Sequence, residues 1–292
     1  MRIAMIGFGE AAQTFVEAWG RARSPHLRVY DIKTDDPDAR AGKLADYARF
    51  GLTGAEDSEQ ALDRAELVFS LVTADECTAA ARASAPWLSS GALYLDMNSV
   101  APATKQAAAQ RIEAFGGRYA DVAVMAPVCT NLADVPMLVA GPHAEAARTA
   151  LAQLGFAARV VGGPVGSAAT IKMTRSIMIK GIEALTAECL LTARAAGVEA
   201  EVIASLDASF DGWDWRARAD YNLDRMLVHG RRRAEEMRAS AETAAGFGQS
   251  GAMARASAEW QQRLGDLGLA PLPAGFDAKA DAIIDQCRKD IA

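Results

Sequence analysis

The stretch RIAMIGFGEAA, residues 2–12, decides the fold of the first half of the chain. It begins with a short apolar run typical of a buried strand and continues as G-x-G-x-x-A into a predicted helix. Gly7 permits a tight turn, Gly9 lets the backbone approach a pyrophosphate, and Ala12 allows close packing of helix and strand. The loop predicts a cofactor site made by Gly7, Phe8, Gly9, Glu10, Ala11 and Ala12.

An acidic residue stands at the distance from this loop that dinucleotide recognition requires. Asp31 ends the predicted strand 27–31, 22 residues after Gly9, where a carboxylate can accept hydrogen bonds from both ribose hydroxyls. Its charge repels a 2′-phosphate and favours NAD, whereas nearby Lys33 leaves NADP as the alternative cofactor. A tight strand-to-helix turn without a ligand is the structural alternative for the loop alone.

The segments that follow alternate between strand-like and helix-like patterns. This alternation predicts an α/β domain with a doubly wound, parallel Rossmann sheet. From about residue 163 strand signals stop, and 166–196 reads as one long helix. We therefore expect a dinucleotide-binding domain at 1–162 and an all-helical substrate and dimerisation domain at 163–292. The further predicted strands are 67–72, 92–97, 119–124 and 136–141.

Composition narrows the function classes. The chain has 292 residues, 51% hydrophobic content and a net charge of −6. An acidic balance argues against nucleic-acid or anionic-membrane partners. Four cysteines and three histidines show no zinc-ligand spacing, which predicts no metal and a reduced, cytoplasmic protein. The apolar runs are too short for a signal segment or a membrane span.

With these motifs in view, the chain resembles the β-hydroxyacid dehydrogenase family, which includes 3-hydroxyisobutyrate and 6-phosphogluconate dehydrogenases. The resemblance covers residues 1 to about 195 well and the remainder loosely. The segment 229–237 looks like a divergent branch with its own C-terminal helical domain. The matching segments are GFGEAA at 7–12, LDMNSVAP at 95–102, YADVAVMAPV at 119–128 and GSAATIKM at 166–173.

The resemblance implies a catalytic role for Lys172, in a cleft between the domains and against the nicotinamide. A free lysine has a pKa of about 10.4, so burial and the neighbouring positive charge of Arg175 are expected to tune it. Lys172 would then be the general base in oxidation and the general acid in reduction. Val72, Thr73, Asn98 and Ser99 are expected at the cofactor, although Asn98 and Ser99 also suit a turn and helix N-cap.

The long helix carries a polar stripe and a separate apolar stripe. A solvated surface is the alternative explanation of the polar stripe. The polar residues are Lys172, Arg175, Ser176, Lys180 and Glu183, and the apolar residues are Met178, Ile182, Leu185 and Cys189.

Two departures from the family affect the substrate site. Ser176 stands where the family has Asn, and Met125-Ala126-Pro127 stands where it has Ser-Gly-Gly. Pro127 has no backbone N–H, so the usual carboxylate cradle is weakened. Arg175, His229 and Arg232 are the candidates to replace it, with a surface Arg232–Glu236 pair as the alternative.

These features predict an oxidoreductase that transfers a hydride between NAD and a small hydroxy acid or related alcohol, with catalytic Lys172 and Ser176. The substrate is expected to be acidic and the protein a homodimer. The alternatives are an oxidative decarboxylase like 6-phosphogluconate dehydrogenase, an imine reductase, which Lys172 disfavours, and a non-catalytic NAD(H)-binding sensor or scaffold.

Overall fold

The computed structural model describes residues 1–20, 26–52, 54–128 and 131–289. It divides into two compact units, Met1–Lys172 and Met173–Ala292. Cys129, to which the sequence assigns no role, lies outside the described residues.

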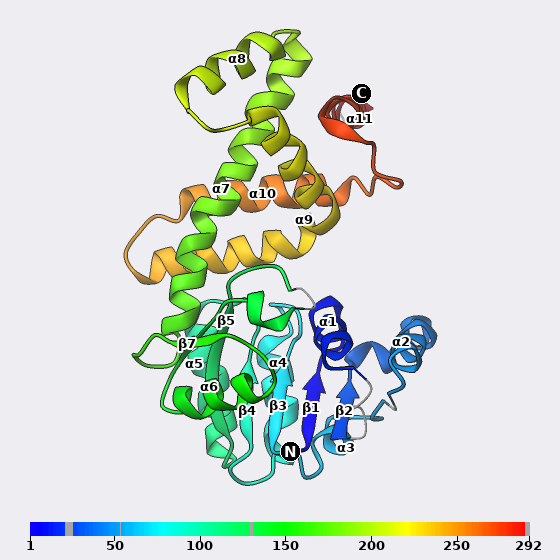
Figure 1. The fold of residues 1–292 in the computed structure, drawn as a ribbon, viewed down its shortest axis with the longest axis vertical. Helices are drawn as coiled ribbons and strands as arrows, with labels where there is room; N and C mark the ends of the chain where they lie inside the picture. Colours follow the sequence, from blue (N-terminus) through cyan, green and yellow to red (C-terminus); the bar gives the residue numbers. More distant parts are fainter. Residues whose placement is uncertain (21–25, 53, 129–130, 290–292) are drawn as a thin grey trace. The chain divides into compact units, whose positions relative to one another are not determined.

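The first unit is a sheet with helices on both faces (Figure 1). Its strands are β1 (Ile3–Ile6), β2 (Leu27–Tyr30), β3 (Leu67–Ser70), β4 (Leu93–Asp96), β5 (Arg118–Val124), β6 (Met137–Ala140) and β7 (Ala158–Val160). Its helices are α1 (Glu10–Trp19), η2 (Ile32–Thr34), α2 (Pro37–Arg49), α3 (Ser58–Leu62), α4 (Cys77–Ser84), η3 (Ala85–Trp87), α5 (Pro102–Ala114), η4 (Leu132–Asp134), α6 (Ala144–Gln153) and the start of α7 (Ser167–Ala196).

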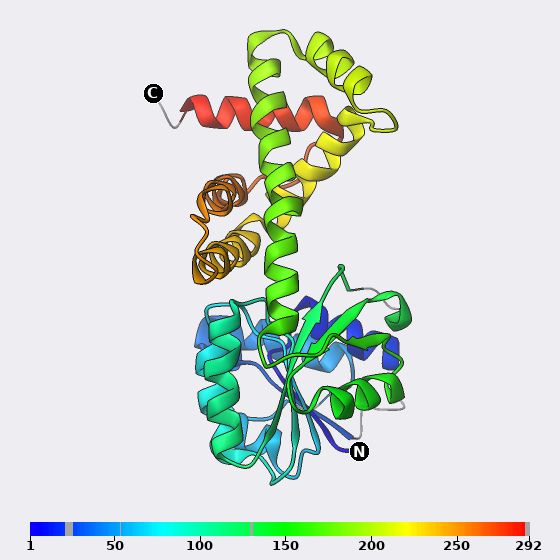
Figure 2. The ribbon, with the colours of Figure 1, turned by 90° about the vertical axis from the view of Figure 1, so that its left-hand side faces the viewer.

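Strand β1 shows why both faces of the sheet are covered. Ile3 and Met5 point into one core with residues of α1 and α6, and Ala4 and Ile6 point into a second core with α3, α4 and α5. Figure 2 shows these helices on opposite sides of the sheet. Because successive strand side chains alternate, an all-apolar strand must be buried on both faces.

The strand order is β2-β1-β3-β4-β5-β6-β7. The strands β2, β1, β3, β4 and β5 pair in parallel, and the predicted doubly wound sheet is confirmed. The pair β5–β6 is antiparallel, which differs from the expected all-parallel sheet. Among its described residues the connection, 125–136, contains the short η4 and no α-helix, and an α-helix is the usual crossover to a parallel neighbour. The short strand β7, absent from the sequence prediction, pairs in parallel with β6.

The second unit consists of helices over its described residues. The remainder of α7 packs with α9, α10 and α11 around a core that includes Leu190, Leu223, Met226 and Leu264. Its other helices are α8 (Glu199–Ser209), α9 (Trp215–Gly246), α10 (Ala252–Asp266) and α11 (Gly275–Lys289). The long helix predicted at 166–196 and the helical second half are confirmed.

Helices α9 and α10 approach each other closely at a pair of glycines. A Cβ built on Gly230 would lie 2.2 Å from the backbone oxygen of Gln261 and 2.8 Å from the Cα of Gly265. Only residues without a side chain permit this backbone approach, so Gly230 sets the spacing of the two helices.

Candidate functional site

The predicted cofactor residues follow four neighbouring parallel strands of the first unit. Gly7 follows β1, Asp31 follows β2, Val72 follows β3 and Asn98 follows β4. Since parallel strands end at the same edge, the fold brings these residues together. The edge includes the point where the strand order reverses between β1 and β3, which is where open α/β sheets bind their ligands.

The two glycines of the first turn, Gly7 and Gly9, differ in whether the backbone conformation requires glycine. Gly7 has φ +88°, and a Cβ there would lie 2.5 Å from the backbone oxygen of Leu71, so the fold itself requires glycine. Gly9 has φ −86°, and a Cβ there would meet nothing within 4 Å. The backbone conformation therefore does not require glycine at residue 9.

Gly9 is also the N-cap of α1, and no side chain caps this helix end. Open space in front of free helical N–H groups fits a pyrophosphate, which the helix dipole attracts. The uncapped start of α1 thus has room for the pyrophosphate of a dinucleotide, at the loop that the sequence predicted.

The other residues of the loop support its shape. Phe8 is fully buried, and its ring makes an edge contact with Tyr47 at a centroid distance of 5.2 Å. The Phe8 side chain is therefore part of the core. Ala12 is buried in the core, Ala11 is half-buried, and Glu10 is exposed.

Asp31 is held by the backbone on both sides of its carboxylate. It accepts a 2.8 Å hydrogen bond from the Phe8 N–H and a 3.0 Å bond from the Lys33 N–H, and it is 9% exposed. The carboxylate is therefore fixed beside the glycine turn, as a ribose-binding residue requires. Sequence reasoning missed Lys43, whose buried ammonium donates to the Phe8 carbonyl at 3.0 Å.

The turn after β4 is fixed by a buried polar network. The Asn98 side-chain oxygen accepts from the Val72 N–H at 2.8 Å, and its amide nitrogen donates to Ser70 Oγ at 2.9 Å. Asp96 Oδ1 accepts from the Asn98 N–H at 2.9 Å. Asn98 is 4% exposed, so it ties the ends of β3 and β4 together, and it is the adjacent Ser99 that contacts Lys172.

Asp96 is the centre of this network. Lys105 Nζ donates to its backbone oxygen at 2.6 Å and to Oδ1 at 2.9 Å, and the Tyr119 hydroxyl donates to Oδ2 at 2.6 Å. Burial alone would lower the pKa of Lys105, but the attraction of Asp96 and Asp121 outweighs it and raises that pKa. Burial and the negative charge of Asp96 raise the pKa of the Cys77 thiol to about 12.

Lys172 is the last residue of the first unit and lies one and a half turns into α7. Its Nζ donates a 2.6 Å hydrogen bond to Ser99 Oγ and is partly buried. The structure thus joins two predicted residues that are 73 positions apart in the sequence. The other predicted residue on this edge, Thr73, is exposed.

The substrate-loop residues Met125, Ala126 and Pro127 follow β5; Met125 and Ala126 are half-buried, and Pro127 is exposed. The Met125 N–H donates to the Pro136 carbonyl at 2.9 Å, which continues the β5–β6 pairing by one residue. The backbone N–H of Met125 is therefore used within the sheet.

The remaining predicted residues lie in the second unit, on α7 and α9. Lys180 Nζ is 2.8 Å from Glu236 Oε2 and donates to Ser176 Oγ at 3.2 Å, and Arg232 pairs with the same Glu236. Lys180 and Glu236 thus connect Ser176 with Arg232, and the Arg232–Glu236 pair is the one that the sequence offered as the alternative to a substrate role. Arg175 is exposed and His229 is half-buried.

Part of the polar stripe on α7 is buried. Ser176, Lys180 and Glu183 are each 5–6% exposed, whereas Met178 is 66% exposed and Leu185 is 64% exposed. A solvated surface is thus the wrong explanation for these three polar residues. Glu183 pairs with Arg233 of α9 and also accepts from Gln261 of α10 at 3.0 Å.

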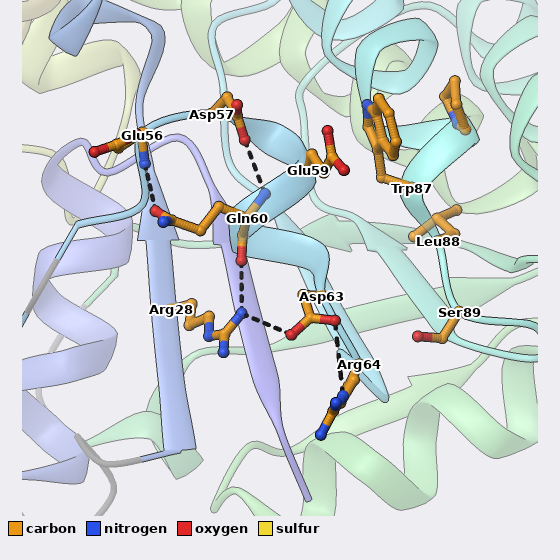
Figure 3. A pocket seen from close by; sticks show the side chains of 11 residues that line it. Arg28, Glu56, Asp57, Glu59, Gln60, Asp63, Arg64, Trp87, Leu88 and Ser89 are labelled. Carbon is orange, nitrogen blue, oxygen red and sulfur yellow. Dashed lines mark hydrogen bonds and ion pairs between the residues drawn. The ribbon is translucent and has the colours of Figure 1, made fainter.

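Figure 3 shows a surface hollow of the first unit, with Arg28, Asp63 and Trp87 among its lining residues. Its residues precede β3 and β4 or begin β2, which places it at the amino ends of the strands. Arg28 donates to the Gln60 carbonyl at 2.7 Å and to Asp63 at 3.3 Å. With Glu56, Asp57, Glu59 and Asp63 around it, the hollow is acidic and does not suit a dinucleotide.

Among the described residues, no group of three or more His, Cys, Asp or Glu side chains could bind a metal ion. Within the same residues, none of the helices combines the length and apolar character needed to cross a membrane.

A glycine turn, a fixed carboxylate after the second strand and a polar turn after the fourth define a dinucleotide-binding protein. Residues 2–162 match the family described as NAD binding domain of 6-phosphogluconate dehydrogenase, and the chain belongs to this family. The NAD-binding domain also confirms the predicted NAD(P) cofactor class. Residues 193–264 match a domain of unknown function, DUF1932.

Three similar proteins align with most of the length of this chain. A conserved hypothetical protein from Sinorhizobium meliloti 1021 is 37% identical, with a TM-score of 0.73, and 98% of this chain aligns with 96% of that one. Mycobacterium tuberculosis 3-hydroxyisobutyrate dehydrogenase, solved with L-serine, shares the fold at 14% identity and a TM-score of 0.69, over 99% and 100% of the two chains. An uncharacterized 28.5 kDa protein from Methanothermus fervidus is 25% identical over 238 residues, 81% of this chain and 88% of that one.

The two domain matches and these likenesses confirm a divergent branch of the β-hydroxyacid dehydrogenases with its own C-terminal domain. They also support an oxidoreductase as the broad class of the protein.

Proposed function

We propose that this protein transfers a hydride between NAD and a small hydroxy acid or related alcohol, with Lys172 as the general acid and base. The observation that carries the proposal is the 2.6 Å contact between Lys172 Nζ and Ser99 Oγ at the edge that carries the glycine turn. In this contact the partly buried amine of Lys172 lies beside the turn after β4, which we expect at the nicotinamide.

The protein's part in the reaction is to hold the substrate and to move a proton. The nicotinamide cofactor accepts or supplies the hydride when it is bound. In oxidation, neutral Lys172 takes the hydroxyl proton as the carbon–oxygen double bond forms, and in reduction its ammonium returns that proton. The Ser99 hydroxyl accepts one N–H of Lys172, which limits where the amine can point.

Asp31 supports NAD rather than NADP as the cofactor. Its carboxylate is fixed by two backbone N–H groups, so it cannot easily turn away from a 2′-phosphate. We expect NADH to bind at least tenfold more tightly than NADPH, and equal affinities would contradict this assignment.

The catalytic assignment is tested by two substitutions at one position. Lys172→Met removes the amine, and Lys172→Arg keeps a positive charge that does not deprotonate. General acid–base catalysis contributes about 10²- to 10⁴-fold, so both variants should lose kcat by that order with NADH affinity within threefold of wild type. Turnover is measured by nicotinamide absorbance over a panel of hydroxy acids, alcohols and the matching carbonyl compounds.

The outcomes separate the alternatives. Full activity in Lys172→Arg would mean that charge, and not proton transfer, is the contribution of this residue. Tight NADH binding without turnover of any compound would favour a sensor. Release of CO2 during oxidation would favour the decarboxylase, and reduction of imines alone would favour an imine reductase.

We also propose that two copies associate through three exposed apolar side chains of α7. Met178, Ile179 and Leu185 are 66%, 41% and 64% exposed, and large side chains on one long helix suit a protein partner. Light scattering should give a dimer, and Leu185→Glu should shift it towards monomer. A monomeric wild-type protein would remove this proposal.

A further inference from the structure

The helix that carries Lys172 begins with an unusual cap. The carbonyl of Gly166 accepts the first helical hydrogen bond, from the Thr170 N–H at 2.8 Å, so Gly166 is the N-cap of α7. An N-cap side chain normally accepts from the N–H of the third helical residue, but glycine has none. Gly166 has φ +101°, and a Cβ there would lie 3.1 Å from Pro102 Cβ, which favours glycine at this position.

Asp121 of β5 supplies the missing acceptor. Its Oδ2 accepts from the Gly166 N–H at 3.0 Å and from the Ala169 N–H at 3.1 Å, and Ala169 is the third residue of the helix. The Asp121 side chain is fully buried. A carboxylate against free N–H groups at a helix start is favourable both as an acceptor and as a charge facing the helix dipole.

The same carboxylate is linked to the turn after β4. Asp121 is the register partner of Asp96 in the adjacent strand. Lys105 Nζ, bonded to Asp96, lies 3.6 Å from Asp121 Oδ1, which accepts no hydrogen bond among the described residues. Two adjacent buried carboxylates are tolerable only with a cation between them, so Lys105 holds the two strand ends in one arrangement.

Each of the two carboxylates also binds a backbone segment that leads to one partner of the contact between Lys172 and Ser99. Asp96 accepts from the N–H of Asn98, next to Ser99, and Asp121 caps the helix that leads to Lys172. The two partners of the 2.6 Å contact are therefore positioned by one ion network, although neither belongs to it.

We propose that Asp121 is a positioning residue for Lys172: it caps α7 from the neighbouring strand and, through Lys105 and Asp96, sets the place of the amine against Ser99. Its catalytic consequence rests on the proposed function, whereas its effect on α7 does not.

The structural test is hydrogen–deuterium exchange of the full-length protein, followed by mass spectrometry. In Asp121→Ala we expect the amides of residues 166–172 to exchange at least tenfold faster than in wild type. In Asp121→Asn, which keeps one oxygen for both N–H groups, exchange should stay within about threefold. Asp57→Ala is the matched control, because Asp57 caps α3 through the Gln60 N–H at 2.8 Å. It should leave 166–172 unchanged.

Unchanged exchange at 166–172 in folded Asp121→Ala would overturn the proposal. If that variant does not fold, Asp121→Ser is measured instead, since its shorter side chain cannot reach both N–H groups. Faster exchange at 166–172 in Asp121→Ser would support the proposal, and unchanged exchange would overturn it.

The catalytic test uses the substrate found for the wild-type enzyme. Asp121→Ala should lose kcat at least tenfold with the KM for NADH within twofold, and Asp121→Asn should restore most of kcat. Faster exchange together with an unchanged kcat would overturn the positioning role. Faster exchange with an inactive wild type would refute the proposed function and leave the capping role of Asp121 standing.

Discussion

Gly9→Ala separates the needs of a cofactor from the needs of the fold. The added Cβ has nothing within 4 Å, and φ −86° is accessible to alanine. The unfavourable term that remains is a poorer N-cap, which costs at most about 1 kcal/mol and lowers Tm by about 2–4 °C. We therefore expect a folded protein with nearly wild-type stability.

The affinity for NADH should fall much further. If the pyrophosphate lies on the start of α1, the methyl group of residue 9 occupies its place and breaks one charged hydrogen bond. Such a bond is worth about 1.5–3 kcal/mol, which corresponds to a loss of about 10- to 100-fold in Kd. Fluorescence titration with NADH and thermal unfolding are measured on the same preparation.

Gly7→Ala is the matched control in the same turn. Its Cβ would lie 2.5 Å from the Leu71 backbone oxygen, and its φ is +88°, so stability should fall by about 2 kcal/mol or more. Wild-type NADH affinity in a folded Gly9→Ala protein would refute the placement of the pyrophosphate on this turn.

Two further predictions concern stability. Gly230→Ala should lower the stability of the second unit by about 1–3 kcal/mol, because its Cβ would meet the Gln261 backbone oxygen at 2.2 Å. Gly181→Ala, whose nearest neighbour would be 3.8 Å away, should be neutral or stabilising in the same thermal melts, and equal effects of the two would contradict this packing. The folded-state pKa of Cys77 is raised from 9.0 to about 12, so its contribution is complete below pH 9 and is lost as pH rises towards 12. Between pH 9 and 10.5, denaturant unfolding should show a loss of stability about 2 kcal/mol larger in wild type than in Cys77→Ala, and an identical slope in both proteins would argue against it.

Local patterns in the sequence were enough for the architecture. The glycine turn and the acidic residue after the second strand depend on spacings within about thirty residues, and the alternation of strands and helices is repeated along the whole first half. The helix at 166–196 was visible because few residues interrupt it. These signals are local, and the structure confirms the fold that they predict.

The direction of β6 could not be read in this way. A strand has the same apolar pattern whether it runs parallel or antiparallel to its neighbour, so the residues of β6 do not show its direction. The polar stripe of α7 was similarly ambiguous, since helical spacing shows which residues share a face and not what covers that face.

The sequence by itself determined the class of fold, the cofactor turn and the lysine that we propose as the acid and base. Only the tertiary structure decided that Lys172 meets Ser99, that Asp121 caps the lysine helix, and that Lys105 lies between two carboxylates. The physical reason is that these contacts join residues up to 73 positions apart. A buried charge leaves no periodic pattern in the sequence, because its partners come from other strands and helices.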